Sequence, residues 1–190
     1  IRFDEWGLDT CFASVQKAWG LPAGFTVCAV SERCMERSAA MENKGYYFDF
    51  MVMDKFHQKM QTPATPSIAH LHGLAKVLRD IDSETPAGRN QRHMQLAKTA
   101  RAWALKHGQQ LFPEKGYESV TMTTIRNVRD WPVQDIYDVL ETRGYRMDRG
   151  YGQIRGETFR IAHMGNVMPD DLEEYLSQFD AVLKKLGVLQ

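Results

Sequence analysis

Apolar residues recur at helical spacing in four stretches of the chain. Positions 68, 71, 74, 75 and 78 are apolar, and they predict a helix with one buried face, opened by Thr65 as its cap and Pro66 as its first residue. Three further helices are predicted, at about Arg89–His107, at Pro132–Thr142, and from Pro169 to the end of the apolar pattern near position 186. These helices supply most of the predicted core.

Short β-rich runs lie between the helical stretches. Phe25–Val30, residues 120–125 and Thr158–His163 are predicted strands. Ser31 follows the first strand as an N-cap, which predicts a helix through about residue 40. Gly45–Asp54 is rich in aromatic residues without clean alternation, and we interpret it as a loop or irregular strand near a pocket or a subunit contact.

A break in the middle of the chain divides the pattern. Ser83–Gly88 reads Ser-Glu-Thr-Pro-Ala-Gly, which ends the helix before it and predicts a hinge between two domains, 1–85 and 86–190. The order strand, helix, strand, helix over residues 120–186 predicts a small α+β layer. At 190 residues the chain is long enough to bury a substantial core in one large or two small domains.

Composition limits the partners. Lysine and arginine number 24 and so do aspartate and glutamate, so the balance favours neither a nucleic acid nor a membrane as a partner. No apolar run approaches the length of a membrane span. The three cysteines and six histidines show no metal-ligand spacing, so no metal is expected, and unpaired thiols predict a cytoplasmic protein.

Lys17 is the only formally charged residue between Thr10 and Ala29. Burying an ammonium group is costly, and desolvation favours the neutral amine, which is a nucleophile able to form a Schiff base with a carbonyl compound. The alternative is a lysine whose head reaches water past a hydrophobic stem.

Three motifs, in order along nearly the whole chain, carry a resemblance. Asp4–Asp9 together with Ser14–Pro22 is similar to the active-site lysine segment of class V aminotransferases, which use pyridoxal 5'-phosphate (PLP) and have the aspartate-aminotransferase fold. Gln61–Pro66 resembles their cofactor-phosphate loop, and Gly152–Gly165 resembles their substrate-carboxylate strand. Within the class, the alanine–glyoxylate and serine–pyruvate aminotransferases are the most similar group.

The resemblance implies a role for each matching residue. Lys17 would hold PLP as a Schiff base and act as the catalytic base, and Gln16 would approach the cofactor phosphate unless it bonds its own loop. Thr65 would reach the phosphate of a neighbouring subunit's cofactor, which implies a homodimer; the alternative is a plain helix cap. Thr62, three residues before Thr65, is a second candidate for the cofactor phosphate, at a position where the resemblance implies tyrosine in many relatives. Arg160 would bind the substrate carboxylate, the alternative being a surface arginine on a strand.

The resemblance also implies the fold class. We expect an α/β chain formed by the C-terminal part of a PLP-transferase large domain, residues 1–85 with the lysine loop and a linking helix, followed by a small α+β domain, residues 86–190. The aspartate that pairs with the pyridine nitrogen, a glycine turn and a ring-stacking aromatic are expected upstream of Ile1. Asp4 and Asp9 are interpreted as turn and capping residues.

The predicted function is transfer of an amino group from a small amino acid of the alanine or serine type to a short 2-oxo acid such as glyoxylate or pyruvate. Two alternatives stay open: a truncated, non-catalytic fragment that folds and dimerises, and a phosphonate-type transaminase of the same class. A cysteine desulfurase ranks lower, because none of Cys11, Cys28 and Cys34 lies in a sequence resembling that enzyme's mobile cysteine loop.

Overall fold

The computed structural model describes residues 1–189 and divides the chain into two compact units. Unit 1 comprises Ile1–Arg79, and unit 2 begins at Asp80. The division falls inside helix α3 (Ile68–Glu84). The assignment of residues 1–85 and 86–190 to two domains stays a prediction, and each unit is described here by itself.

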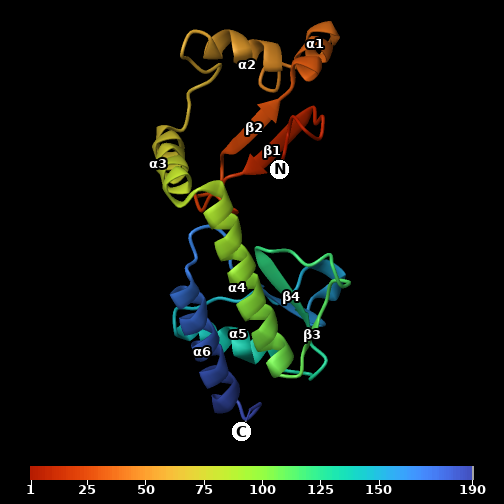
Figure 1. Ribbon diagram of the computed structural model, residues 1–190, viewed down its shortest axis with the longest axis vertical. Coiled ribbons are helices and arrows are strands. Elements are labelled where there is room, and N and C mark those ends of the chain that lie inside the picture. The colour runs from red at the N-terminus through yellow and green to blue at the C-terminus, as the bar shows by residue number, and fades with distance from the viewer. Residues whose placement is uncertain (190) are drawn as a thin grey trace. The chain divides into compact units, whose positions relative to one another are not determined.

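Unit 1 is built on a β-hairpin. Strand β1 (Thr10–Ser14) pairs antiparallel with β2 (Thr26–Val30), and Ser14 opposite Thr26 is the last pair before the connecting segment. Helices α1 (Glu32–Ala40) and α2 (Phe50–His57) follow and contact each other, and the first part of α3 completes the unit (Figure 1). The connection at the end of the hairpin is therefore the segment that carries Lys17.

The capping prediction for α1 is confirmed, whereas the interpretation of Gly45–Asp54 is wrong in part. Ser31 caps α1, and its side chain accepts a hydrogen bond from the amide of Cys34 at 3.1 Å. Helix α2 begins at Phe50, because the Asp49 carboxylate accepts the Met51 amide at 2.9 Å and thereby satisfies a free donor of the first turn. A local cap outweighed the aromatic composition of this segment.

Unit 2 combines a three-stranded sheet with three helices. The antiparallel sheet has the order β3 (Gln110–Leu111), β4 (Met122–Arg126), β5 (Thr158–Ala162). Helix α4 (Pro86–Lys106) contacts β3 and β4, and α6 (Pro169–Lys185) contacts both α4 and α5 (Val133–Thr142), as Figure 1 shows. A 3-10 turn, η1 (Gly152–Ile154), precedes β5. The predicted helices and strands of this half are all present.

The break between α3 and α4 is a single residue. Thr85 has a φ of 66°, which a helix does not tolerate, and its side chain accepts the Gly88 amide at 3.1 Å. Pro86 then occupies the first turn of α4, where its missing N–H costs nothing. The predicted break at Ser83–Gly88 is confirmed, with α4 starting earlier than expected.

The hydrophobic core lies in unit 2. Trp103, Trp131, Phe159 and Phe179 form its centre, with Trp131 stacked on Phe159 at 5.8 Å between ring centroids. Aromatic pairs in offset or edge geometry stabilise a core beyond the area that they bury. Phe159 and Phe179 have no exposed surface, so this unit has the packing of an independent core.

Unit 1 is different, because it buries little. Of its described residues, Val15 and Val77 are the only buried apolar side chains, and its two-stranded sheet leaves an edge open on each side. Large apolar side chains are exposed instead, among them Phe12, Phe48 and Met60. No helix of the described residues is long and apolar enough to span a bilayer.

Candidate functional site

The segment around Lys17 is a tight, hydrogen-bonded turn at the end of the hairpin. The Val15 amide donates to the Phe25 carbonyl at 3.2 Å, and the Leu21 amide donates to the Val15 carbonyl at 3.0 Å. The Gly20 amide closes the turn by donating to the Lys17 carbonyl at 3.0 Å, with Gly20 at a φ of 67° that favours glycine. Val15, with no exposed surface, anchors the turn, so Lys17 projects from a fixed backbone.

The Lys17 side chain itself is exposed. Of the two interpretations of Lys17, the exposed side chain fits a lysine whose head reaches water: Val15 takes the buried position, and Lys17 lies on the turn. Within residues 1–189 the Lys17 amine has neither a hydrogen-bond nor an ion-pair partner, and the Gln16 side chain is likewise exposed without one. Both groups are free to meet a ligand.

The predicted phosphate loop precedes α3 but does not cap it as expected. Helix α3 begins at Ile68, and the Ser67 carbonyl accepts the Leu71 amide at 3.1 Å, so Ser67 occupies the capping position that the sequence assigned to Thr65. Thr62 donates its hydroxyl proton to the Ala64 carbonyl at 2.6 Å. Thr65 is exposed, and its hydroxyl has no partner among the described residues.

His70 joins this loop to the lysine segment. Its Nε2 lies 3.0 Å from the Pro22 carbonyl oxygen, and its Nδ1 lies 2.7 Å from the Ser67 hydroxyl. A carbonyl can only accept, so Nε2 carries the proton and Nδ1 accepts from Ser67. The imidazole also stacks on Phe25, with 5.8 Å between ring centroids. His70 thus fixes the start of α3 against the residues that follow Lys17.

Close packing supports the same contact. A Cβ on Gly73 would lie 2.9 Å from a methyl of Leu21, closer than two carbon atoms pack. The absence of a side chain at Gly73 therefore lets α3 approach the lysine segment. Sequence reasoning assigned no function to His70. Its partner Pro22 is 48 positions away, so no local signal could have revealed the contact.

In unit 2 the predicted carboxylate-binding residue, Arg160, lies on β5. It is opposite Thr124 of β4, and its partly exposed side chain points away from the core that Phe159 and Ile161 enter. The alternation predicted from the sequence is therefore correct. The Arg160 guanidinium pairs with Asp148, from Nε to Oδ1 at 2.7 Å and from the second nitrogen to Oδ2 at 2.5 Å. These two bonds hold the pKa of the Asp148 carboxyl below its usual value.

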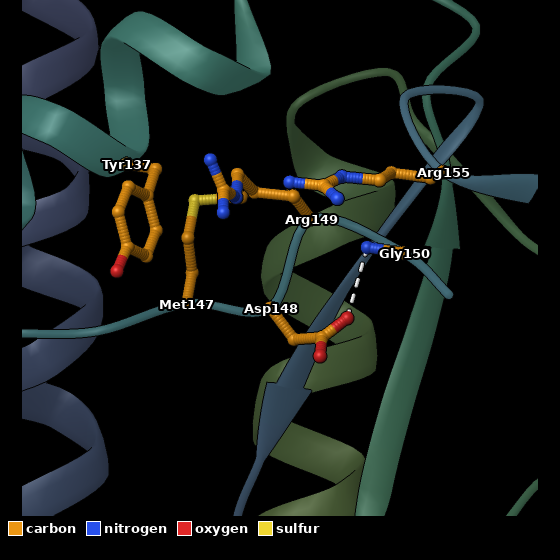
Figure 2. A pocket seen from close by; sticks show the side chains of 6 residues that line it. All are labelled: Tyr137, Met147, Asp148, Arg149, Gly150 and Arg155. Carbon is orange, nitrogen blue, oxygen red and sulfur yellow. Dashed lines mark hydrogen bonds between the residues drawn. The ribbon is translucent and has the colours of Figure 1, made fainter. Parts of the chain in front are cut away.

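A pocket of about 220 Å³ opens beside Asp148. Figure 2 shows Arg149 against the ring of Tyr137 and Arg155 reaching in from the other side. The Arg149 guanidinium lies 4.2 Å from the Tyr137 ring centroid and donates to Gln134. Two positive side chains therefore line a space next to one carboxylate.

His163 follows Arg160 by three positions and is fully buried. Its Nε2 lies 2.9 Å from the Thr123 hydroxyl, whereas its Nδ1 has no partner among the described residues. Burial disfavours the imidazolium and lowers the pKa of His163 to about 4, with smaller effects from His93 and Arg101.

The structure thus brings the sequence candidates together in two groups. Gln16 and Lys17 share one turn in unit 1, and His70 ties the segment after that turn to the helix that follows Thr62 and Thr65. Arg160 lies in unit 2, paired with Asp148. His70 and Asp148 are the residues that sequence reasoning missed.

Comparison with known proteins gives relatives that are aminotransferases. The chain is 32% identical to the serine–glyoxylate aminotransferase of Arabidopsis thaliana over 98% of its own length and 47% of the relative. It is 30% identical to an uncharacterized aminotransferase of Methanocaldococcus jannaschii over 98% of the chain and 49% of the relative, and 27% identical to the L-aspartate–glyoxylate aminotransferase of Paracoccus denitrificans. The chain spans about half the length of the curated relatives it matches. No family model matches it.

Solved structures share the fold. An alanine–glyoxylate aminotransferase from Nostoc sp. superposes with a TM-score of 0.87 at 23% identity, over 96% of this chain and 50% of that one. The ureidoglycine–glyoxylate aminotransferase of Bacillus subtilis gives 0.89 at 20% identity, over 97% and 49%. The mixed α/β arrangement is that of the C-terminal portion of these enzymes, which confirms the predicted fold class.

Proposed function

We infer that this chain, a homologue of the alanine–, serine– and aspartate–glyoxylate aminotransferases of class V, supplies the lysine and the substrate arginine of a PLP-dependent aminotransferase. The resemblance carried by the three motifs is confirmed by these relatives. The reaction that we propose moves an amino group from a small amino acid to a short 2-oxo acid such as glyoxylate. Because the chain spans about half of each relative, this activity is proposed for a protein that contains the whole enzyme.

The observation that carries the proposal is the geometry of Lys17. Its amine is exposed and free of partners in the described chain, and it projects from a turn that three backbone hydrogen bonds hold in one conformation. An amine on a fixed backbone that has no ion-pair partner can attack a carbonyl carbon without first breaking an ion pair. The same amine, when free, is the base that takes the α-proton of the amino-acid substrate.

The residues near Lys17 fit PLP as the cofactor. PLP, once bound, supplies an electron sink for the substrate's α-carbon. The Gln16 amide is a donor next to Lys17 in the same chain. The free Thr65 hydroxyl and the first N–H groups of α3 are donors that we assign to the phosphate of the second subunit's cofactor. Thr62 joins this set only by giving up its bond to the Ala64 carbonyl.

Arg160 is the residue that we assign to the substrate carboxylate. Its guanidinium fork lies on the solvent-facing side of β5, and its two bonds to Asp148 display the paired geometry that a carboxylate requires. A small amino acid or a 2-oxo acid presents such a carboxylate in both halves of the transfer. We therefore assign the same residue to donor and acceptor.

A homodimer in the cytoplasm completes the proposal. Exposed aromatic side chains of unit 1, namely Tyr46, Tyr47 and Phe48, form the kind of surface that protein interfaces cover. The Thr62–Thr65 loop is proposed to reach the phosphate of the second subunit. The cysteines of the described chain form no disulfide, which is typical of a reducing compartment.

The experiment traps the Schiff base. The 190-residue chain is mixed with PLP, reduced with borohydride, digested and mapped by mass spectrometry. We expect the label on Lys17 and its loss in Lys17→Ala. Lys59→Ala is the matched control, because Lys59 is also an exposed lysine of unit 1, and it should leave the labelling unchanged. Labelling spread evenly over exposed lysines would instead favour the non-catalytic fragment.

A further inference from the structure

The guanidinium fork of Arg160 already has an occupant in this chain. Asp148 presents both carboxylate oxygens to it, at 2.7 Å from Nε and 2.5 Å from the second nitrogen. Two parallel N–H···O bonds to one carboxylate are the strongest and most specific contact that an arginine makes. A guanidinium has five N–H donors, and Asp148 occupies the edge formed by Nε and its neighbouring nitrogen. A substrate carboxylate that takes this Nε edge would use the same donors, so the two carboxylates cannot share it.

The backbone places Asp148 there before any ligand arrives. The Arg160 amide donates to the Asp148 carbonyl at 2.9 Å, and the Asp148 amide donates to the Arg160 carbonyl at 3.3 Å, which pairs the two residues along the free edge of β5. The Gly150 amide donates to Asp148 Oδ1 at 2.9 Å (Figure 2). The Arg160–Asp148 ion pair therefore forms at little cost in conformational entropy, because the backbone already holds the two residues opposite each other.

The turn after Asp148 is built for glycine. Gly150 has a φ of 83°, and a Cβ there would lie 2.7 Å from the carbonyl oxygens of Ile154 and Thr158. Backbone oxygens cannot move aside as a flexible side chain can, so the turn holds one conformation. The Gly150 amide is thereby kept pointing at the Asp148 carboxylate.

We propose that Asp148 is an intramolecular competitor for the Nε edge of the Arg160 guanidinium, so that a substrate carboxylate takes this edge only by displacing it. This inference rests on the proposed function of Arg160. The pair lies at the surface, with 25% of the Arg160 side chain and 45% of the Asp148 side chain exposed, so water can replace either partner. The contact therefore weakens substrate binding and favours ligands whose carboxylate is held by further contacts.

The pocket beside Asp148 lowers the cost of the exchange. Arg149 and Arg155 both line it, and Arg155 has no ion-pair partner among the described residues (Figure 2). When the Asp148 carboxylate leaves Arg160, it therefore remains close to positively charged side chains. Asp148 can thus leave the Arg160 guanidinium and still be held in this pocket.

The test measures carboxylate binding at Arg160 directly. The full 190-residue chain, labelled with ¹⁵N, is titrated with propionate in low salt while the Arg160 Nε–H resonance is followed by NMR. Propionate carries the carboxylate of the substrates and has no amine or carbonyl group that reacts elsewhere. Asp148→Asn removes the charge but keeps an oxygen for the Gly150 amide.

We expect propionate to bind Asp148→Asn about threefold to tenfold more tightly than the unchanged chain, the range given by a partly exposed ion pair with two hydrogen bonds. Glu173→Gln is the matched control, because it removes one exposed carboxylate of the same unit and should leave the affinity unchanged. Equal or weaker binding by Asp148→Asn would overturn the proposal, and weaker binding would make Asp148 a residue that positions the guanidinium.

A third variant separates this inference from the proposed function. Arg160→Lys has no guanidinium Nε–H, so propionate binding to this variant is read from the amide resonances of β4 and β5. If it binds propionate as the unchanged chain does, the assignment of Arg160 as the carboxylate-binding residue fails. If Arg160→Lys loses binding but Asp148→Asn shows no gain, only the competition fails. The amide resonances of β4 and β5 are compared in every variant, because they report whether the sheet that carries both residues is intact.

Discussion

Lowering the pH from 7 to 5 should destabilise unit 2 through one buried histidine. His163 has no exposed surface, and burial lowers its pKa to about 4, from 6.5 in an exposed histidine. Between these two values the unfolded chain binds a proton that the folded chain excludes. The free energy of unfolding therefore rises with pH in this window: the stabilisation is complete above pH 6.5 and is lost as the pH falls toward 4.

The size of the effect follows from the pKa difference. One proton taken up only by the unfolded state changes the free energy of unfolding by about 1.4 kcal/mol per pH unit. The full window is therefore worth about 3 kcal/mol, and the part between pH 7 and pH 5 is worth about 2 kcal/mol. Carboxyl groups interfere little in this range. The Arg92 and Arg89 guanidiniums lower the pKa of Glu84 to about 2, so its contribution is lost only at more acidic pH.

The assay is urea unfolding at pH 7, 6 and 5, followed by near-ultraviolet circular dichroism of the Trp103–Trp131 cluster in the core of unit 2. His163→Gln keeps a side chain able to bond the Thr123 hydroxyl and has no proton to take up, so its stability should change by less than about 0.5 kcal/mol over the same range. His57→Gln changes an exposed histidine of unit 1 and should retain the full pH dependence.

Two results would contradict this reasoning. An unchanged chain that is equally stable at pH 7 and pH 5 would mean that His163 is protonated in the folded state. A His163→Gln variant that keeps the loss of about 2 kcal/mol would assign the effect to another group. Burial of the His163 imidazole would then not be the cause of the pH dependence.

Two further variants test contacts on which the site depends. Gly150→Ala should lower the free energy of unfolding of unit 2 by about 3 kcal/mol in urea, because its Cβ would meet two backbone oxygens. Gly152→Ala is the control: Gly152 also has a positive φ but has open space around it, so this change should cost about 1 kcal/mol. Equal losses in the two variants would contradict the steric argument. His70→Ala removes two hydrogen bonds and a ring contact at the start of α3. The hydrogen-bonded amides of that turn, beginning with Leu71, should therefore lose about 2 kcal/mol of protection against hydrogen exchange. His57→Ala should leave those amides unchanged, and protection retained in His70→Ala would show that packing at Gly73 is sufficient.

The fold of unit 2 could be predicted because its periodicity is strong and local. The helix from Pro169 and the strand Thr158–His163 alternate apolar and polar residues with the periods that their burial requires, and both occur as expected. Unit 1 was harder, because few of its side chains are buried and its elements depend on local caps. Strand β1 was not predicted at all: Thr10–Ser14 is short, and its pairing partner β2 lies beyond an eleven-residue connection, residues 15–25.

The candidate site divides along the same line. The resemblance to class V aminotransferases made Lys17 and Arg160 candidates, because the motifs around them are visible in the sequence, and their roles stay predictions. The groups that surround them were not visible. His70 meets Pro22 across 48 positions, and Asp148 meets Arg160 across 12, around a glycine turn whose conformation no pattern encodes. Side-chain pairs formed by tertiary contact leave no periodic signal.

Lys17 shows why the isolation of a charge in sequence is a weak guide to burial. The uncharged stretch from Thr10 to Ala29 is a hairpin with a turn, and a turn needs small or flexible residues rather than a dry environment. Val15 enters the interior, whereas Lys17, two positions later, lies on the exposed part of the turn. We therefore expect selective reaction at Lys17 to come from Gln16 beside it and from the fixed turn, which His70 ties to α3 through Pro22, and not from desolvation of the amine by this chain. This explanation predicts that PLP labelling of Lys17 is unchanged in Lys59→Ala and reduced in His70→Ala.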